Sequence, residues 1–390
     1  MATKSWTLLD VQHNIVVDTP GRNSEMFVRD EKHLHGSKVE KYTKSGGLSD
    51  GVDVLHVVNG EFEFRVLPTR GMNVWDAFYQ GTRIGWHSPI HGPVHPKYVP
   101  VSEPSGLGWL DGFDELFVRC GLESNGAPEF DEESGRLIYP LHGRIGNKPA
   151  NKVEVEIDDE GEITIRAEVL ETRFHFLKLK LITEIKTKPG EIGFRVHDTI
   201  ENLSAAEAEA QILYHVNFGD PMLDAGSQVM CAAEQIVPRN EHAASAIKSW
   251  DHYQAPTLGF EEMVYFFKLR GDKDGNTQTL LKNAHSQKGA SLIFNTKQLP
   301  CFTLWKDTGS IEDGYVTGLE PGSNFPNPRT YEGEQGRVVK LAAKGSAEFD
   351  VQFIYHPDEA SIAAAEAAVG KLSAGKEPKI FDTPQTGWCA

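Results

Sequence analysis

Alternation of apolar and polar positions with a period of two dominates this chain. In EFEFRVL, the side chains of Phe62, Phe64 and Val66 would share one face of a strand. Residues 151–200 repeat the pattern in successive runs separated by turn sequences such as DDEG and KPGE, and residues 349–355 alternate again. Short alternating runs bounded by Gly, Pro and Asp are typical of antiparallel sandwiches and barrels. The pattern therefore predicts an all-β fold.

One stretch near the C-terminus predicts a helix instead. DEASIAAAEAAVGKL begins with acidic residues and is rich in alanine, a good helix former, so we expect a helix over about residues 358–371. No Pro/Ser-rich linker divides the chain, and no internal repeat stands out. We therefore expect a single domain over residues 1–390, with the strands of about residues 1–60 and the C-terminal helix as additions to it.

The segment from about residue 86 to 150 has a different composition. It is rich in Gly, Pro, His and Trp, and its alternation is weak. This composition predicts a segment made mainly of loops. Loops on a rigid β scaffold often carry binding and catalytic residues, so the segment is a candidate for part of a functional site.

Composition and charge exclude some partners. The chain has 390 residues, of which 39% are hydrophobic and 24% charged, as in an ordinary globular protein. Its net charge of −17 would repel phosphate backbones, so we expect no nucleic-acid partner. The start of the chain does not read as a secretory signal, and no apolar run approaches the ~18–20 residues of a spanning helix. We therefore expect no membrane contact.

The cysteines favour a reducing compartment. Cys120, Cys231, Cys301 and Cys389 lie far apart and show no C-x-x-C pairing. They are expected to be free thiols, with Cys389 in an exposed tail, and the protein is expected to be cytoplasmic.

Other short motifs do not support a catalytic serine or a nucleotide site. GLSDG at 47–51 fits the G-x-S-x-G pattern of a nucleophile elbow, but a strand-like run follows it where a helix is required, so it predicts a turn. No Walker or G-x-G-x-x-G pattern is present, which gives no support to a nucleotide cofactor.

Three histidines in WHSPIHGPVHP have a spacing that would suit a metal site on a helix. His87, His91 and His95 are four residues apart, but the prolines between and after them break any helix. A metal site would require this loop to fold back on itself. We therefore expect loop histidines here and no bound metal.

Three other segments carry a possible acid–base set. PLHGRIGN contains His142 and Arg144, LYHVNFGDP contains His215 and Asn217, and GLEPGSNFP contains Glu320. A lone histidine on a strand is usually a structural group, and Glu-Pro before a turn is often a solvated strand end. Together, however, two imidazoles and a carboxylate without a nucleophile suit paired proton transfers.

Other residues would suit the binding of a sugar. Arg70 in LPTRGM and Lys306 in LWKD could donate hydrogen bonds to hydroxyls or to an anionic group. Trp86, Trp109 and Trp305 could stack on the apolar face of a sugar ring, although tryptophans also fill cores.

The segments together resemble a known family. LPTRGMNVWD, GWLDGFDELFVRCGL, LHGRIGN, ILYHVNFGDP and TGLEPGSNFP occur in a consistent order over roughly residues 64–328. This set resembles the aldose 1-epimerase (galactose mutarotase-like) superfamily, most closely its DUF4432 branch. The resemblance implies a large antiparallel β-sandwich, a supersandwich, with a sugar cleft over one sheet.

The resemblance also implies roles for individual residues. It implies that His215 donates a proton to the ring oxygen, that Glu320 takes the proton of the anomeric hydroxyl, and that His142 helps to bind the ring. The chain departs from the family pattern because a tyrosine precedes His215 where one follows the family histidine. The family's sugar-binding aspartate has no counterpart that the sequence identifies.

Five residues are expected to bind the substrate: Arg70, Arg144, Asn217, Trp305 and Lys306. The two arginines have no obvious equivalents in mutarotases. If they face the cleft, the sugar would be acidic or phosphorylated, because guanidinium groups bind carboxylate and phosphate.

The sequence thus predicts an isomerase that interconverts sugar anomers by His/Glu acid–base catalysis, without a metal or an organic cofactor. Its partner would be a small sugar, sugar acid or sugar phosphate. Two alternatives stay open: a sugar-binding protein without turnover, since fold does not fix function, and a metal-dependent sugar isomerase or epimerase that uses the histidines of residues 87–95.

Overall fold

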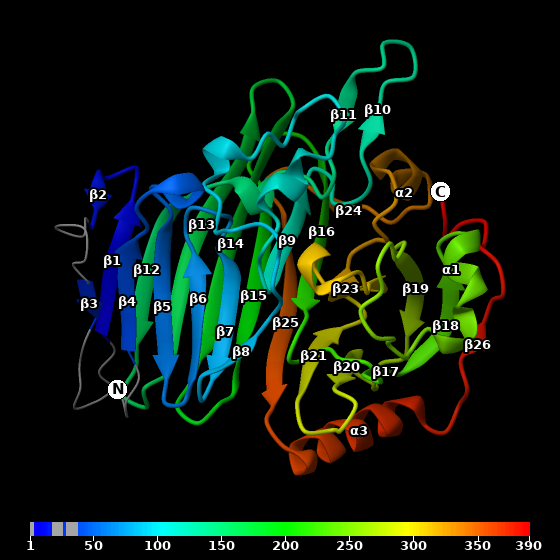
Figure 1. The fold of residues 1–390 in the computed structure, drawn as a ribbon. Coiled ribbons are helices and arrows are strands. Elements are labelled where there is room, and N and C mark those ends of the chain that lie inside the picture. Colours follow the sequence, from blue (N-terminus) through cyan, green and yellow to red (C-terminus); the bar gives the residue numbers. More distant parts are fainter. Residues whose placement is uncertain (1–3, 18–25, 29–37) are drawn as a thin grey trace.

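The computed structural model describes residues 4–17, 26–28 and 38–390, and these residues form mainly β-strands in two large sheets (Figure 1). The strands of the first sheet are β1 (Lys4–Asp10), β2 (Ile15–Val16), β12 (Ala150–Ile157), β13 (Ile163–Arg173), β14 (Leu177–Thr187), β15 (Gly193–Asn202), β17 (Gln228–Cys231), β20 (Asn276–Lys282), β21 (Gly289–Asn295) and β25 (Ser346–His356). Their spatial order is β17-β20-β21-β25-β15-β14-β13-β12-β1-β2.

The second sheet is larger, with 14 strands in the described part of the chain. Its strands are β3 (Met26–Val28), β4 (Lys38–Thr43), β5 (Asp53–Asn59), β6 (Phe62–Leu67), β7 (Asn73–Tyr79), β8 (Thr82–Ile84), β9 (Phe117–Leu122), β16 (Ala208–Phe218), β18 (Ala233–Pro238), β19 (Met263–Leu269), β22 (Cys301–Asp307), β23 (Val316–Gly322), β24 (Val339–Leu341) and β26 (Lys379–Ile380). The order along its main path is β26-β18-β19-β22-β23-β16-β9-β7-β6-β5-β4-β3. A separate hairpin pairs β10 (Glu129–Phe130) with β11 (Leu137–Tyr139).

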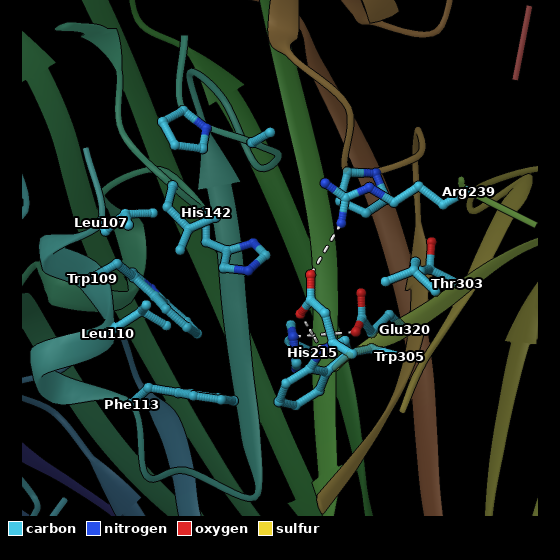
Figure 2. Close-up of a pocket in the computed structure, with 16 residues that line it drawn as sticks. Leu107, Trp109, Leu110, Phe113, His142, His215, Arg239, Thr303, Trp305 and Glu320 are labelled. Carbon is cyan, nitrogen blue, oxygen red and sulfur yellow. Dashed lines mark hydrogen bonds and ion pairs between the residues drawn. The ribbon is translucent and has the colours of Figure 1, made fainter. Parts of the chain in front are cut away.

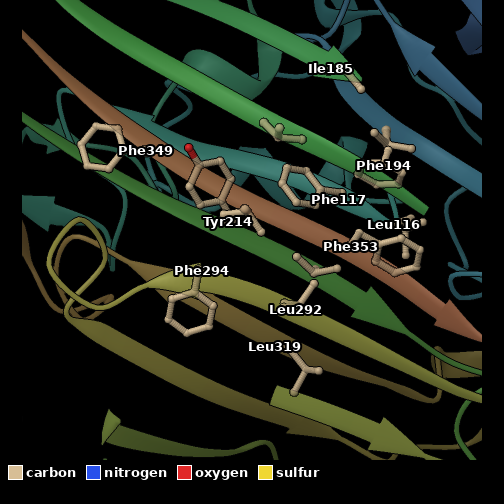
Figure 3. Close-up of a cluster of buried hydrophobic side chains, with 14 of the residues drawn as sticks. Leu116, Phe117, Ile185, Phe194, Tyr214, Leu292, Phe294, Leu319, Phe349 and Phe353 are labelled. Carbon is tan, nitrogen blue, oxygen red and sulfur yellow. The ribbon is translucent and has the colours of Figure 1, made fainter. Parts of the chain in front are cut away.

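The two sheets pack face to face around one main apolar core. The ring centroid of Phe194 on β15 lies 5.1 Å from that of Phe64 on β6. Phe194 also contacts Phe117 of β9, with ring centroids 5.9 Å apart, and stacks on Phe353 of β25 (Figure 3). Such ring contacts between sheets are typical of a sandwich core. The predicted large antiparallel β-sandwich is confirmed.

The local predictions also hold where the pattern is strong. Residues 151–200 form β12, β13, β14 and β15, each paired antiparallel with the next. The predicted helix is α3 (Glu359–Ser373), which Asp358 caps by accepting a hydrogen bond from the backbone N–H of Ser361. Its buried face, which includes Ile362, packs on Leu280 of β20.

Two short helices were not predicted, α1 (Glu241–Ser245) and α2 (Arg329–Glu334). Of the strands expected as N-terminal additions, β1 and β2 lie at one edge of the first sheet, whereas β3, β4 and β5 lie at one edge of the second. Val39 of β4 and Leu55 of β5 belong to the main core. None of the helices in the described ranges is both long and apolar enough to cross a bilayer.

All four cysteines are free thiols, as expected. The placement of Cys389 in an exposed tail was wrong, because its thiol lies half-buried, with Sγ 3.5 Å from the carbonyl oxygen of Pro238.

The segment of about residues 86–150, predicted to be made mainly of loops, contains the 3₁₀ turns η2 (Pro96–Tyr98), η3 (Gly108–Gly112) and η4 (Ile145–Asn147), together with strand β9 and the β10–β11 hairpin. Its loops cover part of the outer face of the large sheet. The aromatic rings of Trp86, Trp109 and Phe113 pack against Val118 of β9 and Leu213 of β16. This packing places the loop segment over the strands that carry His215 and Glu320.

Candidate active site

A pocket of about 290 Å³ lies on the outer face of the large sheet, at the lower end of the ~300–1,000 Å³ range of small-molecule sites. Strands β16, β22 and β23 form its floor, and the η3 region forms one wall. Figure 2 shows Trp109 and Phe113 on one side, Arg239 and Thr303 on the other, and His215 between them.

The period of two along β16 places His215 in this pocket. Tyr214 and Val216 point into the core between the sheets, so His215 and Asn217 lie on the opposite, outer face. The register of β16 with β23 pairs Asn217 with Gly318 and Val216 with Leu319, which brings His215 opposite Glu320.

His215 and Glu320 meet on the pocket floor. Nε2 of His215 lies 3.1 Å from Oε1 of Glu320, and the side chains are only 5% and 2% exposed. The contact is close, but it is not aligned as a hydrogen bond, so Glu320 Oε1 has no hydrogen-bond partner among the described residues. An imidazole and a carboxylate therefore face each other at the point where a ligand can reach both.

Asn217 fixes the orientation and tautomer of His215. Its Nδ2 donates to the carbonyl oxygens of Glu115 and His215, at 3.0 and 3.2 Å, which turns its Oδ1 toward the imidazole. The Nδ1–H of His215 donates to that oxygen at 2.6 Å. When the imidazole is neutral, its proton is thus on Nδ1, and Nε2 faces Glu320 as an acceptor.

Burial opposes charge on both members of the pair. Burial, assisted by the nearby imidazole of His142, lowers the pKa of His215 well below its ordinary value of 6.5. Burial, assisted by the carboxylate of Glu262, raises the pKa of Glu320 well above 4.5. Both directions favour a neutral imidazole beside a protonated carboxyl group, so the pair carries one transferable proton in all.

The third predicted catalytic residue, His142, lies beside this pair. Its ring centroid is 5.2 Å from that of His215, and its Nδ1–H donates to the carbonyl oxygen of Asn125 at 3.0 Å. Burial lowers the pKa of His142 to about 4, so the ring is neutral at pH 7 and its Nε2 is a hydrogen-bond acceptor.

A pair of buried amides joins the segments that carry His142 and Glu320. The side chains of Asn125 and Asn324 hydrogen-bond to each other twice, at 2.8 Å in each direction, although they are 199 residues apart. Asn125 also accepts the hydrogen bond from His142, and Asn324 follows the β23 strand of Glu320. The amide pair therefore helps to hold the two segments in one site.

Three aromatic rings surround His215. The centroids of Phe113 and Trp305 are 5.3 Å from that of His215, and the centroid of Trp109 is 6.1 Å away. Trp305, one of the five residues expected to bind the substrate, lines the pocket. Apolar ring faces beside polar groups suit a ligand with both C–H faces and hydroxyl groups.

The pocket rim holds an ion pair that the sequence did not indicate. A guanidinium nitrogen of Arg239 is 3.3 Å from Oε1 of Glu262, and the two side chains are 40% and 49% exposed. The indole N–H of Trp305 donates to Glu262 Oε2 at 2.7 Å. No recognisable motif surrounds either residue, so the sequence carried no signal for them.

The structure places Arg70 away from the pocket. Its side chain is buried and lies 2.7 Å from the carboxylate of Glu115, with further hydrogen bonds to the carbonyl oxygens of Val94 and Gly112 and to Asn147. Arg70 thus holds the covering loops together from beneath. The prediction that it contacts the substrate finds no geometric support.

Arg144 and Lys306 are also outside the pocket lining. Arg144 pairs with Glu123 at 3.0 Å. The Lys306 ammonium donates to three backbone carbonyl oxygens, and burial lowers its pKa to about 8. The predicted binding set is therefore divided. Trp305 lines the site and Asn217 supports it, whereas the three cationic residues Arg70, Arg144 and Lys306 lie elsewhere.

The histidines of residues 87–95 do not converge on this site. His87, His91 and His95 are absent from the pocket lining, and Nδ1 of His95 accepts a hydrogen bond from the backbone N–H of Lys97. Within residues 4–17, 26–28 and 38–390, no three or more His, Cys, Asp or Glu side chains are grouped so that they could hold a metal ion.

Comparisons with known proteins agree with the fold and the motifs. The family described as "Domain of unknown function (DUF4432)" matches residues 49–354. A crystal structure of a "putative aldose 1-epimerase" from Klebsiella pneumoniae has 36% sequence identity and a TM-score of 0.91, over 98% of this chain and 99% of that one. No functionally curated protein matches the chain.

More distant structures share the fold. A galactose mutarotase-like protein from Clostridium acetobutylicum has 12% identity and a TM-score of 0.56, over 82% of this chain and 98% of that one. A galactose 1-epimerase from Lactobacillus acidophilus has 14% identity and a TM-score of 0.54, over 83% of this chain and all of that one. The chain is therefore a member of the DUF4432 family, with the galactose mutarotase-like fold that its motifs predicted.

Proposed function

We propose that this protein is an isomerase that interconverts the anomers of an aldose, with His215 and Glu320 as the proton-transfer groups. The observation that carries the proposal is the 3.1 Å contact between Nε2 of His215 and Oε1 of Glu320 on the floor of a ligand-sized pocket. The name of the relative with 36% identity, a "putative aldose 1-epimerase", agrees with this chemistry.

Anomer exchange needs one proton to be removed and another to be delivered. In the opening step, Glu320 takes the proton of the anomeric hydroxyl while His215 gives a proton to the ring oxygen. The C1–C2 bond then rotates, and the two groups exchange roles when the ring closes. The pair carries one transferable proton, which must shift from Glu320 to Nε2 of His215 before the opening step. The same shift after the step restores the starting state, so the pair suits an exchange that runs in both directions.

The surrounding residues would bind and orient the sugar. The neutral His142 offers an acceptor to a hydroxyl group, and Trp109, Phe113 and Trp305 offer ring faces to its C–H groups. Asn217 acts through His215 and is a positioning residue.

The charges of the pocket favour an uncharged sugar over a sugar acid or sugar phosphate. Among the described residues, Arg239 is the one Lys or Arg side chain that lines the pocket, and it already faces the carboxylate of Glu262. The other lining groups with polar atoms are mainly hydrogen-bond acceptors, which match the hydroxyl donors of a neutral sugar. A carboxylate or phosphate would find no unpaired cation here.

The test measures anomer exchange by NMR for a panel of neutral aldoses, uronates and sugar phosphates. The wild-type protein should accelerate the exchange of at least one neutral aldose over buffer. Glu320→Gln and His215→Asn should each abolish this acceleration while the circular dichroism spectrum and melting temperature stay unchanged. Full activity in both variants would contradict the proposal.

A matched control uses another His–Glu contact. His56 lies 2.6 Å from Glu63 on the surface of the β5–β6 hairpin, away from the pocket, so His56→Asn should leave the exchange rate unchanged. Saturable sugar binding without any rate enhancement would support a sugar-binding protein instead. Exchange of the C2 hydrogen with solvent deuterium would indicate chemistry at C2 rather than at C1.

A further inference from the structure

We propose that Thr303 is a substrate-binding residue of this site, whose hydroxyl donates a hydrogen bond to the same sugar oxygen that gives its proton to Glu320. The inference rests on the proposed function and extends it to a residue that no motif indicates. It assigns a donor to the anomeric oxygen, where the negative charge develops as the proton leaves.

Thr303 belongs to the floor of the pocket. It lies on β22 directly opposite Glu320 of β23, and residues opposite each other in an antiparallel pair have Cβ atoms about 4.5–5.5 Å apart on the same face. Thr303 lines the pocket and is 1% exposed. The floor therefore presents a row of three polar side chains, His215, Glu320 and Thr303, across three neighbouring strands.

Two groups in this row lack hydrogen-bond partners within the described part of the chain. They are Oγ1 of Thr303 and Oε1 of Glu320, and both atoms are buried. Buried polar atoms in folded proteins are nearly always paired, so two unpaired atoms on neighbouring residues in a pocket indicate that a ligand or water completes them.

A threonine on the neighbouring strand shows the usual arrangement. Thr317 of β23 is equally buried, but its hydroxyl donates to the carbonyl oxygen of Trp305 at 2.6 Å and also contacts the hydroxyl of Tyr253 at 2.8 Å. The unpaired state of Thr303 is thus a property of its place in the pocket and not of threonine on these strands.

A hydroxyl group of a ligand matches both unpaired atoms. Its O–H can donate to Glu320 Oε1 while its oxygen accepts from Thr303 Oγ1–H. In the opening step, the proton passes from the anomeric oxygen to Glu320, the freed electron pair forms the C1=O bond, and the C1–O bond to the ring oxygen breaks. The ring oxygen keeps that electron pair and takes the proton from His215. Thr303 keeps its own proton and stabilises the oxygen by hydrogen bonding.

The test compares Thr303→Val, which replaces the hydroxyl by a methyl group of similar size, with Thr303→Ser, which keeps the hydroxyl. For the neutral aldose that the wild type converts fastest, Thr303→Val should lower kcat/KM about tenfold or more. Thr303→Ser should stay within about threefold of the wild type. Equal losses in both variants, or kcat/KM within about twofold in Thr303→Val, would overturn the proposal.

The chain offers a matched control in Thr279. Its side chain is also buried, and its Oγ1 also lacks a partner among the described residues, but it lies on β20 in the other sheet and does not line the pocket. Thr279→Val should leave kcat/KM unchanged. If Thr279→Val lowered kcat/KM as much as Thr303→Val, the loss would come from replacing any buried threonine by valine. That result would contradict the proposal.

A binding experiment separates this inference from the proposed function. Sugar binding is followed by the fluorescence of Trp109 and Trp305, which line the pocket. Thr303→Val should weaken binding of the aldose about fivefold or more, but it should not weaken binding of its 1,5-anhydro analogue, which lacks the anomeric hydroxyl. If the wild type binds but does not convert any aldose, the isomerase proposal fails, and this selective loss decides the role of Thr303 by itself. Equal weakening of both ligands would overturn the assignment.

Discussion

Gly318 lies two residues before Glu320 on the same face of β23. Because it has no side chain, it leaves the space that the Glu320 carboxylate occupies. A Cβ atom at position 318 would lie 2.6 Å from Oε1 of Glu320 and 3.0 Å from Cε1 of His215. Glycine at this position therefore permits the contact between the acid and the base.

This relationship predicts that Gly318→Ala disturbs the site more than the fold. The atoms in the way are the ends of side chains, so the Glu320 carboxylate and the His215 ring would shift while the strands stay paired. We expect anomer exchange to fall about tenfold or more, with the free energy of unfolding changed by about 1 kcal/mol. NMR exchange and urea unfolding measure the two effects. Retention of full activity would show that the pair tolerates displacement.

Asn217 is expected to act through the tautomer of His215. Asn217→Leu removes the acceptor for the Nδ1–H of His215, so Nε2 is no longer held as the free nitrogen facing Glu320. We expect kcat to fall about 10- to 100-fold with a smaller change in KM, because the variant alters a proton-transfer group and not the ligand contacts. Nitrogen-15 NMR of the imidazole should show a mixed tautomer. A single Nδ1–H tautomer in the variant would contradict this role.

The acid limb of the pH–rate profile should lie well below pH 6.5. The active pair carries one proton, and the second proton is added at the lowered pKa of His215. Catalysis should therefore stay constant as the pH falls through 6.5, and it should decline only at lower pH, where His142 with its pKa of about 4 also becomes charged.

At high pH the pair loses its remaining proton at the raised pKa of Glu320, which sets the basic limb. Exchange rates between pH 4.5 and 9, corrected for buffer catalysis, measure both limbs. The Arg239–Glu262 ion pair faces the site from the rim. An acid midpoint at 6.5 would mean that His215 titrates as if it were solvated.

Arg70 and Arg239 should differ in what they support. Arg70→Met removes the ion-pair partner of the buried Glu115 side chain, so we expect a loss of about 3–5 kcal/mol in the free energy of unfolding. Arg239→Met removes a half-exposed rim residue, so stability should change by less than about 1 kcal/mol while sugar affinity falls. Denaturant unfolding and tryptophan fluorescence measure the two properties. If Arg70→Met weakened sugar binding without lowering stability, Arg70 would be a substrate-binding residue after all.

His356 provides a test of acid stability away from the site. It is 7% exposed, its Nε2 lies 2.8 Å from Oγ of Ser291, and burial lowers its pKa to about 4. Between pH 6.5 and 4 the unfolded chain therefore binds a proton that the folded state excludes, so this group lowers stability as the pH falls.

His356→Gln removes this proton binding, since an amide does not titrate. Between pH 6.5 and 5 the wild type should lose up to about 2 kcal/mol more of its unfolding free energy than the variant. Urea unfolding at the two pH values measures the difference. Other groups, such as Asp114 with its raised pKa, titrate in both proteins and cancel in the comparison. Parallel pH dependences would contradict the lowered pKa of His356.

The strand pattern could be predicted because it depends on near neighbours. The alternation over residues 151–200 forms β12 to β15 by successive hairpins, so each strand is completed by the next run along the chain. The period of two also places His215 and Tyr214 on opposite faces of β16. Applied to β22, the same rule would have placed Thr303 on the face of Trp305, a signal that was available and was not used.

The ligand contacts of the cationic residues could not be predicted from the alternation of side chains along the strands. Arg70 and Arg144 looked like ligands for an acidic sugar, but each is neutralised by a carboxylate 45 or 21 residues away. Whether a charged side chain faces a ligand or a buried partner depends on which distant segments meet it, and the identity of the residue does not reveal this.

The sequence by itself determined the β-sandwich, the loop-rich segment of about residues 86–150 and the residue types of the acid–base pair. The tertiary structure alone decided that the carboxylate of Glu320 lies 3.1 Å from the imidazole of His215, that Thr303 completes the row, and that the arginines turn away. The reason is physical: side-chain alternation is a local property of the backbone, whereas the register between strands about a hundred residues apart is set by the packing of the whole core.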